Sequence, residues 1–308
     1  MVIRFFYRAA YFAVLLSALV GCAPSASSVI WKTEGVDWVY PEPPAQPRIR
    51  FLKQISGLKD LRDKDDAGQR WLKWLGGEET VPLPMVSPYG VAADGKGRIW
   101  VSDPGSGLVH VIDLARKRID YLSVINGRKL LSPVGAVYNS RLKRLYISDT
   151  GLREVLMFDA DNRYLGSLKP KTGFGRPAGM AIDAAGNLYV ADALAGIVDV
   201  FSAAGEYRKS LGSRIAADGK FNRPSNLALD AQGRIYVVDS LRFRVEILGL
   251  ADEPPMLIGG LGDVAGSFAR PRGIALDSAG HIYVSDAAFD NIQVFNRRGD
   301  LLLVLGRG

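Results

Sequence analysis

The sequence predicts an all-β protein built as a β-propeller, and three observations lead to that prediction. A unit of about 45 residues recurs five times along the 308-residue chain, with starts spaced by 44 to 47 residues. Each unit holds four short runs rich in β-branched and aromatic residues, separated by turn residues, as antiparallel strands require. A four-stranded meander cannot bury both of its faces alone, whereas units stacked around an axis can. The units start at Ser87-Pro88, Ser132-Pro133, Arg176-Pro177, Arg223-Pro224 and Arg270-Pro271.

The third unit shows the elements in order. Strands are expected at 179–183, 188–192, 197–201 and 207–211. Between the first two strands, Asp-Ala-Ala-Gly-Asn predicts a tight turn in which Gly186 takes a positive φ. The second unit departs from this rule, because its turn at 139–144 is one residue longer and lacks glycine.

The motifs of the last unit are Pro-x-Gly-Ile-Ala-x-Asp, Gly-x-Ile-Tyr-Val-x-Asp and Ile-x-Val-Phe. They resemble those of the NHL-repeat family of propellers, and the resemblance extends over 86–308. Relatives of this kind usually carry six repeats, with the N-terminus supplying an outer strand. The resemblance therefore implies five complete four-stranded blades on a six-bladed plan with an incomplete sixth blade.

The N-terminal 85 residues predict membrane attachment. Residues 1–21 have Arg4 and Arg8 ahead of a short apolar run, as in a signal peptide. The run ends in Leu-Val-Gly-Cys, which resembles the lipobox of bacterial lipoproteins and implies lipidation of Cys22; an ordinary signal peptide with an incidental cysteine is the alternative. Residues 22–47 read as a lipid-anchored, Pro/Ser-rich tether. Residues 48–85 are expected to form an N-terminal strand and a short helix packed on the propeller.

These features place the protein in the bacterial cell envelope. By resemblance to Gram-negative sorting, Ala23 after the cysteine favours the outer membrane, facing the periplasm or the surface. The net charge is +7, which becomes +5 without Arg4 and Arg8. This mild excess weakly favours an acidic partner and, outside the cytoplasm, gives no reason to expect nucleic acid. Cys22 is the single cysteine, so no internal disulfide is expected.

An aspartate ends the second strand of every unit, and it has two interpretations. Acidic residues on a propeller axis can hold a metal. The same residue in every unit instead favours a structural role, in which each carboxylate accepts backbone N–H groups of its own loop. The five aspartates are Asp103, Asp149, Asp192, Asp239 and Asp286.

Catalytic chemistry has little support in the sequence. The two histidines, His110 and His281, occupy non-equivalent positions of their units. We expect no catalytic set, metal or cofactor. Phe174, Phe221 and Phe268 are expected to anchor the core.

A binding surface is the better hypothesis. In an antiparallel meander the loops between strands two and three share one face of the disc with the connections between successive units. Arginine with aromatic neighbours is typical of recognition surfaces and binds carboxylate or phosphate. In the alternative reading, each Arg-Pro guanidinium pairs with a strand-ending aspartate, which leaves Arg242 and Arg244 as the stronger candidates. The candidate binding residues are Arg153, Arg242, Phe243, Arg244, Arg272 and Phe289.

The sequence thus predicts a membrane-tethered propeller that binds an envelope protein or an anionic polymer. An enzyme of the lactonase or lyase type and a structural subunit of an envelope or export machine remain as alternatives. The oligomeric state is left open.

Overall fold

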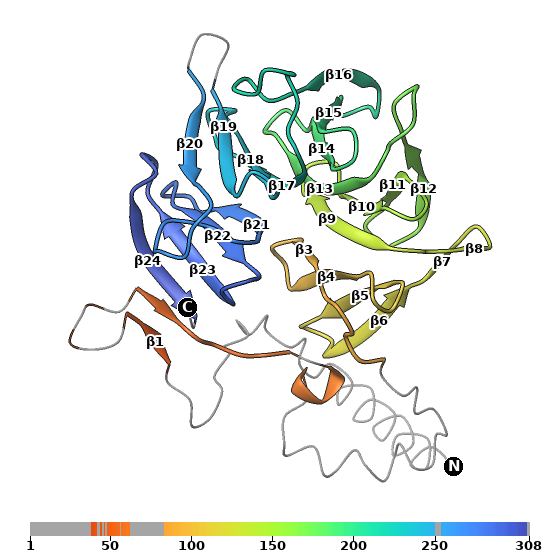
Figure 1. Ribbon diagram of the computed structural model, residues 1–308. Coiled ribbons are helices and arrows are strands. Elements are labelled where there is room, and N and C mark those ends of the chain that lie inside the picture. Colours follow the sequence, from red (N-terminus) through yellow and green to blue (C-terminus); the bar gives the residue numbers. More distant parts are fainter. Residues whose placement is uncertain are drawn as a thin grey trace, which may run out of the picture.

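The computed structural model describes residues 38–41, 44, 46, 48–55, 57–61, 83–249 and 254–306. Its main body is five four-stranded antiparallel sheets, or blades, arranged around a common axis (Figure 1). Blade 1 comprises β3 (Gly90–Ala93), β4 (Arg98–Asp103), β5 (Leu108–Asp113) and β6 (Arg118–Leu122). Blade 2 comprises β9 (Pro133–Asn139), β10 (Arg144–Asp149), β11 (Glu154–Phe158) and β12 (Tyr164–Leu168).

Blades 3 to 5 repeat the pattern. Blade 3 comprises β13 (Pro177–Ile182), β14 (Leu188–Asp192), β15 (Ile197–Phe201) and β16 (Tyr207–Leu211). Blade 4 comprises β17 (Pro224–Leu229), β18 (Ile235–Asp239), β19 (Arg244–Leu248) and β20 (Met256–Gly259). Blade 5 comprises β21 (Pro271–Leu276), β22 (Ile282–Asp286), β23 (Asn291–Phe295) and β24 (Leu301–Gly306). The predicted all-β propeller of five complete blades is confirmed, and three of the four strands expected in the third unit have the predicted bounds.

The first turn of each blade shows why glycine recurs there. Gly186 has a φ of 89°, a left-handed conformation that costs glycine little. In the longer turn of blade 2, Lys143 takes this conformation with a φ of 51°. The missing glycine therefore leaves the hairpin intact and places a lysine in a less favourable backbone region.

The hydrophobic core lies between neighbouring blades. One buried cluster fills each of the four junctions from blade 1 to blade 5. Phe174, Phe221 and Phe268 are 4%, 3% and 0% exposed, and they belong to these clusters, which confirms them as core anchors.

The junction between blade 5 and blade 1 is different. The innermost strands of consecutive blades contact each other from β3 round to β21, but β21 and β3 have no comparable contact. Instead, Ile55, Leu61 and Met85 pack on the outer part of blade 1. Within the described residues, no strands form a sixth four-stranded sheet, so the six-bladed plan remains a prediction.

The described residues of the N-terminal segment form two short strands and one helical turn. β1 (Val39–Tyr40) pairs with β2 (Ile49–Arg50) in a separate two-stranded sheet, and η1 (Leu58–Leu61) is a single 3-10 turn. A second small hairpin, β7 (Val124–Ile125) with β8 (Arg128–Lys129), lies between blades 1 and 2. The N-terminal strand expected within residues 48–85 is β2, and it pairs with β1 and not with a blade.

Several expectations fall outside the described residues. They include the signal peptide, Cys22, most of the tether and the helix expected beyond residue 61. Where the chain is described, none of its helices has the length and apolar character needed to cross a membrane.

Candidate binding face

The five strand-ending aspartates join two loops each. Asp149 accepts the N–H groups of Leu131 and Ser132, which precede its blade, at 2.9 and 3.0 Å. It also accepts those of Gly151 and Leu152, in the loop after β10, both at 2.9 Å. All five side chains are at most 1% exposed, and the other four accept backbone N–H groups in a similar way. The structural interpretation of these residues is confirmed.

The same contacts define one face of the disc. Because one carboxylate binds both the connection into a blade and the loop between its second and third strands, these segments lie on the same side. We call this side the loop face, and the opposite side, formed by the hairpins between strands one and two and between three and four, the turn face.

The arginines of the Arg-Pro dipeptides bind the strand-ending aspartates through their main-chain N–H groups. The N–H of Arg176 lies 2.8 Å from Asp192, and that of Arg223 lies 2.8 Å from Asp239. The N–H of Arg270 likewise donates to Asp286. The alternative in which these three guanidinium groups pair with the carboxylates is wrong, because within the described residues only the main-chain N–H groups of the three arginines bind them.

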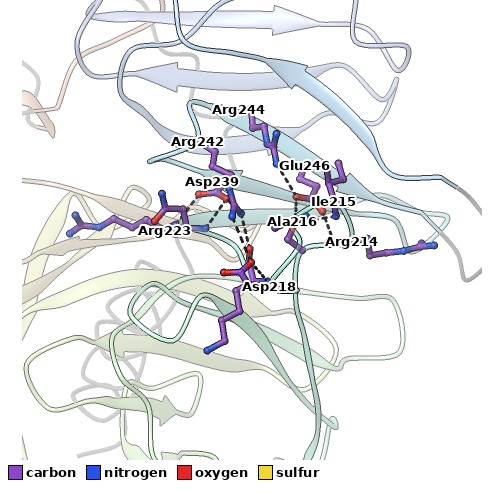
Figure 2. Close-up of polar contacts among 12 residues, drawn as sticks. Arg214, Ile215, Ala216, Asp218, Arg223, Asp239, Arg242, Arg244 and Glu246 are labelled. Atoms are coloured by element: carbon purple, nitrogen blue, oxygen red, sulfur yellow. Dashed lines mark hydrogen bonds and ion pairs between the residues drawn. The ribbon is translucent and has the colours of Figure 1, made fainter.

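Arg242 points inward. Its Nη1 lies 3.1 Å from Oδ2 of Asp239 and 2.7 Å from the carbonyl oxygen of Lys220, while its Nη2 lies 3.9 Å from Asp218 (Figure 2). The side chain is 26% exposed. These contacts hold the connection between blades 3 and 4 against blade 4.

Arg244 makes a similar internal contact. Its Nη2 lies 3.8 Å from Glu246, a carboxylate that is fully buried and also accepts bonds from Ser213 Oγ and the N–H of Arg214 (Figure 2). Its Nε is buried without a hydrogen-bond partner. Both arginines are therefore largely neutralised within the fold. Their main carboxylate partners, Asp239 and Glu246, are near them in sequence, but the sequence does not show that these acids are buried and face the guanidinium groups.

The remaining candidates lie on or near the loop face. Arg153 is exposed and Phe243 is half-buried against the core between blades 4 and 5. Both have a left-handed backbone, with φ of 56° and 55°. Arg272 is half-buried near the start of β21, and Phe289 is half-buried in the loop before β23.

The two faces differ in how their arginines are paired. On the turn face, six arginines each form an ion pair with a nearby acid: Arg116, Arg118, Arg163, Arg208, Arg234 and Arg298. Five arginines of the loop face have no ion pair within the described residues: Arg153, Arg176, Arg223, Arg270 and Arg272. Exposed acids on this face are Asp218, Asp263 and Asp290. Arg141, Arg144 and Arg297 of the turn face also have no ion pair within the described residues, and Arg128 of the loop face pairs with Glu154. Unpaired arginines therefore occur on both sides of the disc, and the loop face carries an exposed group of them in Arg153, Arg176 and Arg270.

The two histidines each have an aspartate partner. Nε2 of His110 lies 3.3 Å from Asp103, and Nδ1 of His281 lies 2.8 Å from Asp277. Burial lowers the pKa of His110 more than Asp103 raises it. Burial would raise the pKa of Asp103, but N–H donors led by those of Val86 and Ser87 hold it at about 2. The pairing of His110 with Asp103 follows from the strand register, which places His110 opposite Val101, two residues before Asp103.

The axis of the propeller contains a cavity of about 570 Å³, lined mainly by the innermost strands. Its lining is apolar apart from backbone groups and a few neutral polar side chains, among them Asn226, Tyr283 and Ser285. Among the described residues that line it, none is an acid, histidine, lysine or arginine. In the described part of the chain, no group of three or more His, Cys, Asp or Glu residues is placed to hold a metal ion.

Known proteins resemble the chain in fold and in repeat sequence. The family model of the SMP-30/gluconolactonase/LRE-like region matches residues 90–237 of the sequence. The family model of the NHL repeat matches residues 268–295. No curated protein sequence matches the chain. A nidogen/laminin complex contains a similar structure, with a TM-score of 0.60 and 18% identity over 74% of this chain and 85% of that one.

Two lyase structures are also similar. A streptogramin B lyase aligns with a TM-score of 0.55 and 14% identity, covering 71% of this chain and 69% of that one. An inactive virginiamycin B lyase from Staphylococcus aureus with quinupristin aligns with a TM-score of 0.55 and 12% identity over the same shares. At these identities the likeness concerns the fold. The repeat match and the five blades show a β-propeller that is similar to the NHL-repeat propellers.

Proposed function

We propose that the protein is a binding platform in the bacterial cell envelope, tethered through Cys22, and that its loop face binds an acidic region of a partner protein. The observation that carries the proposal is the group of exposed arginines on the loop face, Arg153, Arg176 and Arg270, which have no ion pair within the described residues. A guanidinium without an internal carboxylate keeps its donors for a partner, and such groups form forked bonds with carboxylates.

The structure changes which residues carry this proposal. Arg242 and Arg244 bind internal carboxylates. They therefore stabilise the loop face and do not offer their guanidinium groups to a partner. Arg153, Arg176 and Arg270 are exposed and have no internal ion pair, which makes them the stronger contacts. An anionic polymer would engage the same groups, so competition by a soluble polyanion and by an acidic peptide separates the two partner classes.

A lactonase- or lyase-type activity has less support. The matching family model and the lyase structures carry it. Beside the tyrosines Tyr89, Tyr138 and Tyr283, however, the described lining of the axial cavity holds no acid, histidine, lysine or arginine. General acid-base chemistry and metal binding both require such groups within reach of a substrate.

The test is crosslinking and affinity capture of the full chain from intact envelopes. The variant carries Arg153→Glu, Arg176→Glu and Arg270→Glu. Recovery of a captured partner is expected to fall at least about tenfold, because the charge at these three positions of the loop face is reversed. The matched control carries Arg116→Glu, Arg163→Glu and Arg298→Glu on the turn face and should retain the partner. Equal recovery with both triple variants would overturn the proposal.

A further inference from the structure

Blade 5 exposes the face that every other blade buries. The second residue of the third strand packs against the next blade in blades 1 to 4, where Val109, Val155, Val198 and Val245 are each 0% exposed. The equivalent residue of blade 5 is Ile292, which is 40% exposed. An isoleucine at this position retains an apolar surface that no described neighbour covers.

A hydrogen-bond pattern found at two of these junctions, after blades 1 and 2, is incomplete in blade 5; blades 3 and 4 have Ala191 and Val238 in place of the serine. Ser148 Oγ accepts the N–H of Gly135 at 2.8 Å and donates to the carbonyl oxygen of Ala178, in the innermost strand of the next blade, at 2.5 Å. Ser102 joins Gly90 to the carbonyl oxygen of Val134 in the same way.

In blade 5 the first half of this pattern is present. Ser285 Oγ accepts the N–H of Gly273 at 2.9 Å. Among the described residues its hydroxyl proton has no acceptor in a following blade. Ser285 is therefore placed as Ser102 and Ser148 are, with a donor available for a main-chain carbonyl group.

The space around the equivalent glycines also shows that no blade covers this face of blade 5. A Cβ at Gly135 would lie 2.4 Å from the carbonyl oxygen of Ala178, and one at Gly90 would lie 2.3 Å from that of Val134. At Gly273 the nearest atom is Oγ of Ser285, in the same blade, at 3.0 Å. No backbone from another blade approaches Gly273.

Blade 1 forms the other wall of this opening. Val91 is 64% exposed, whereas Met180 and Leu227, at the same position of blades 3 and 4, are 6% and 2% exposed. The outer part of blade 1 is covered by Ile55, Leu61 and Met85. The uncovered region is thus the inner part, next to the axial cavity, whose lining includes Val91 and Ile292.

We propose that this opening is the docking site of a β-hairpin from a partner protein. One strand of the hairpin would supply a main-chain carbonyl oxygen to Ser285, and small apolar side chains would cover Ile292 and Val91. Arg270 and Arg272, at the start of β21, favour a hairpin that carries an acidic residue at its loop-face end. A strand is the expected occupant because Ser102 and Ser148 bind strand carbonyls with the same geometry.

This inference rests on the proposed function only in assuming a protein partner. Its test places a photo-crosslinking residue, p-benzoylphenylalanine, at position 292 of the full chain in cells of the source organism. A second strain carries it at position 176, on the loop face. The crosslinked peptide is mapped by mass spectrometry. The expected product at position 292 joins the chain to another protein, in a segment of alternating apolar residues that includes a turn and an acid.

Two variants test the chemistry of the contact. Ser285→Ala is expected to lower the crosslink yield at position 292 at least about threefold, because it removes the proposed donor. The matched control, Ser140→Ala in an exposed turn-face hairpin, should leave the yield unchanged. An unchanged yield with Ser285→Ala would contradict the strand contact.

The remaining outcomes separate the two proposals. A product at position 292 formed only with this chain, from the same or a second copy, would overturn the inference. So would the absence of any product at 292 while position 176 still crosslinks, and the proposed function would then survive. Crosslinks at neither position would contradict both.

Discussion

The imidazole of His110 lies 3.3 Å from the carboxylate of Asp103, and the two side chains are 1% and 0% exposed. His110 occupies the middle of β5, at the position that Leu156 holds in blade 2. Because the net effect of its surroundings lowers the pKa of His110, the folded protein binds a proton there less readily than the unfolded chain.

The first prediction concerns pH. Between the ordinary histidine pKa of about 6.5 and the lower folded value, the unfolded state binds more protons, so the unfolding free energy falls as pH decreases. His110→Leu should remove this contribution, and the variant should lose less stability than the native protein between pH 7.5 and 5.5. The difference is expected to reach at most about 1.4 kcal/mol per pH unit. Urea unfolding at both pH values measures it, and equal pH slopes would contradict the burial argument.

The second prediction concerns the strand-ending aspartates. Asp149→Asn should lower the unfolding free energy by about 2–4 kcal/mol, because an amide group has one acceptor oxygen for the four N–H donors that Asp149 binds. Asp161→Asn, in an exposed turn, is the matched control and should change stability by less than about 0.5 kcal/mol. Thermal and urea unfolding measure both. If the two variants prove equally stable, the aspartates do not hold the loops.

The third prediction compares two equivalent glycines. Gly135→Ala should destabilise the protein by several kcal/mol or distort the junction, because its Cβ would overlap the backbone of Ala178. Gly273→Ala should cost less than about 1 kcal/mol, since its new methyl group meets only the hydroxyl oxygen of Ser285. Urea unfolding of the purified protein provides the comparison. A similar loss in both variants would mean that a blade covers β21 in solution.

The fourth prediction concerns backbone strain on the loop face. Arg153→Gly should raise the unfolding free energy by about 0.5–1 kcal/mol, because a left-handed residue with a side chain is strained and glycine is not. Phe243→Gly relieves the same strain but loses the packing of a half-buried ring, so it should destabilise the protein. Denaturant unfolding of the two variants tests this difference in sign. A loss of stability with Arg153→Gly would show that its side chain makes a contact needed by the fold.

The sequence alone determined the repeat, the strands and the type of fold. Alternation of apolar residues, turn glycines and the phenylalanines before the three Arg-Pro starts are local signals. They fix the blade because each blade forms from contiguous chain. The role of the strand-ending aspartates was also predictable, since a residue needed in every blade serves the blade itself.

Only the tertiary structure decided which side chains are available for binding. Arg242 and Arg244 looked like the strongest candidates in the sequence, yet their guanidinium groups face Asp239 and Glu246. Ile292 occupies the position at which blades 1 to 4 bury a valine, yet it is exposed because no neighbouring blade covers its face. The physical reason is burial. Asp239 and Glu246 are near the two arginines in sequence, but these acids become buried, and Ile292 stays uncovered, only through the way in which the blades pack around the axis.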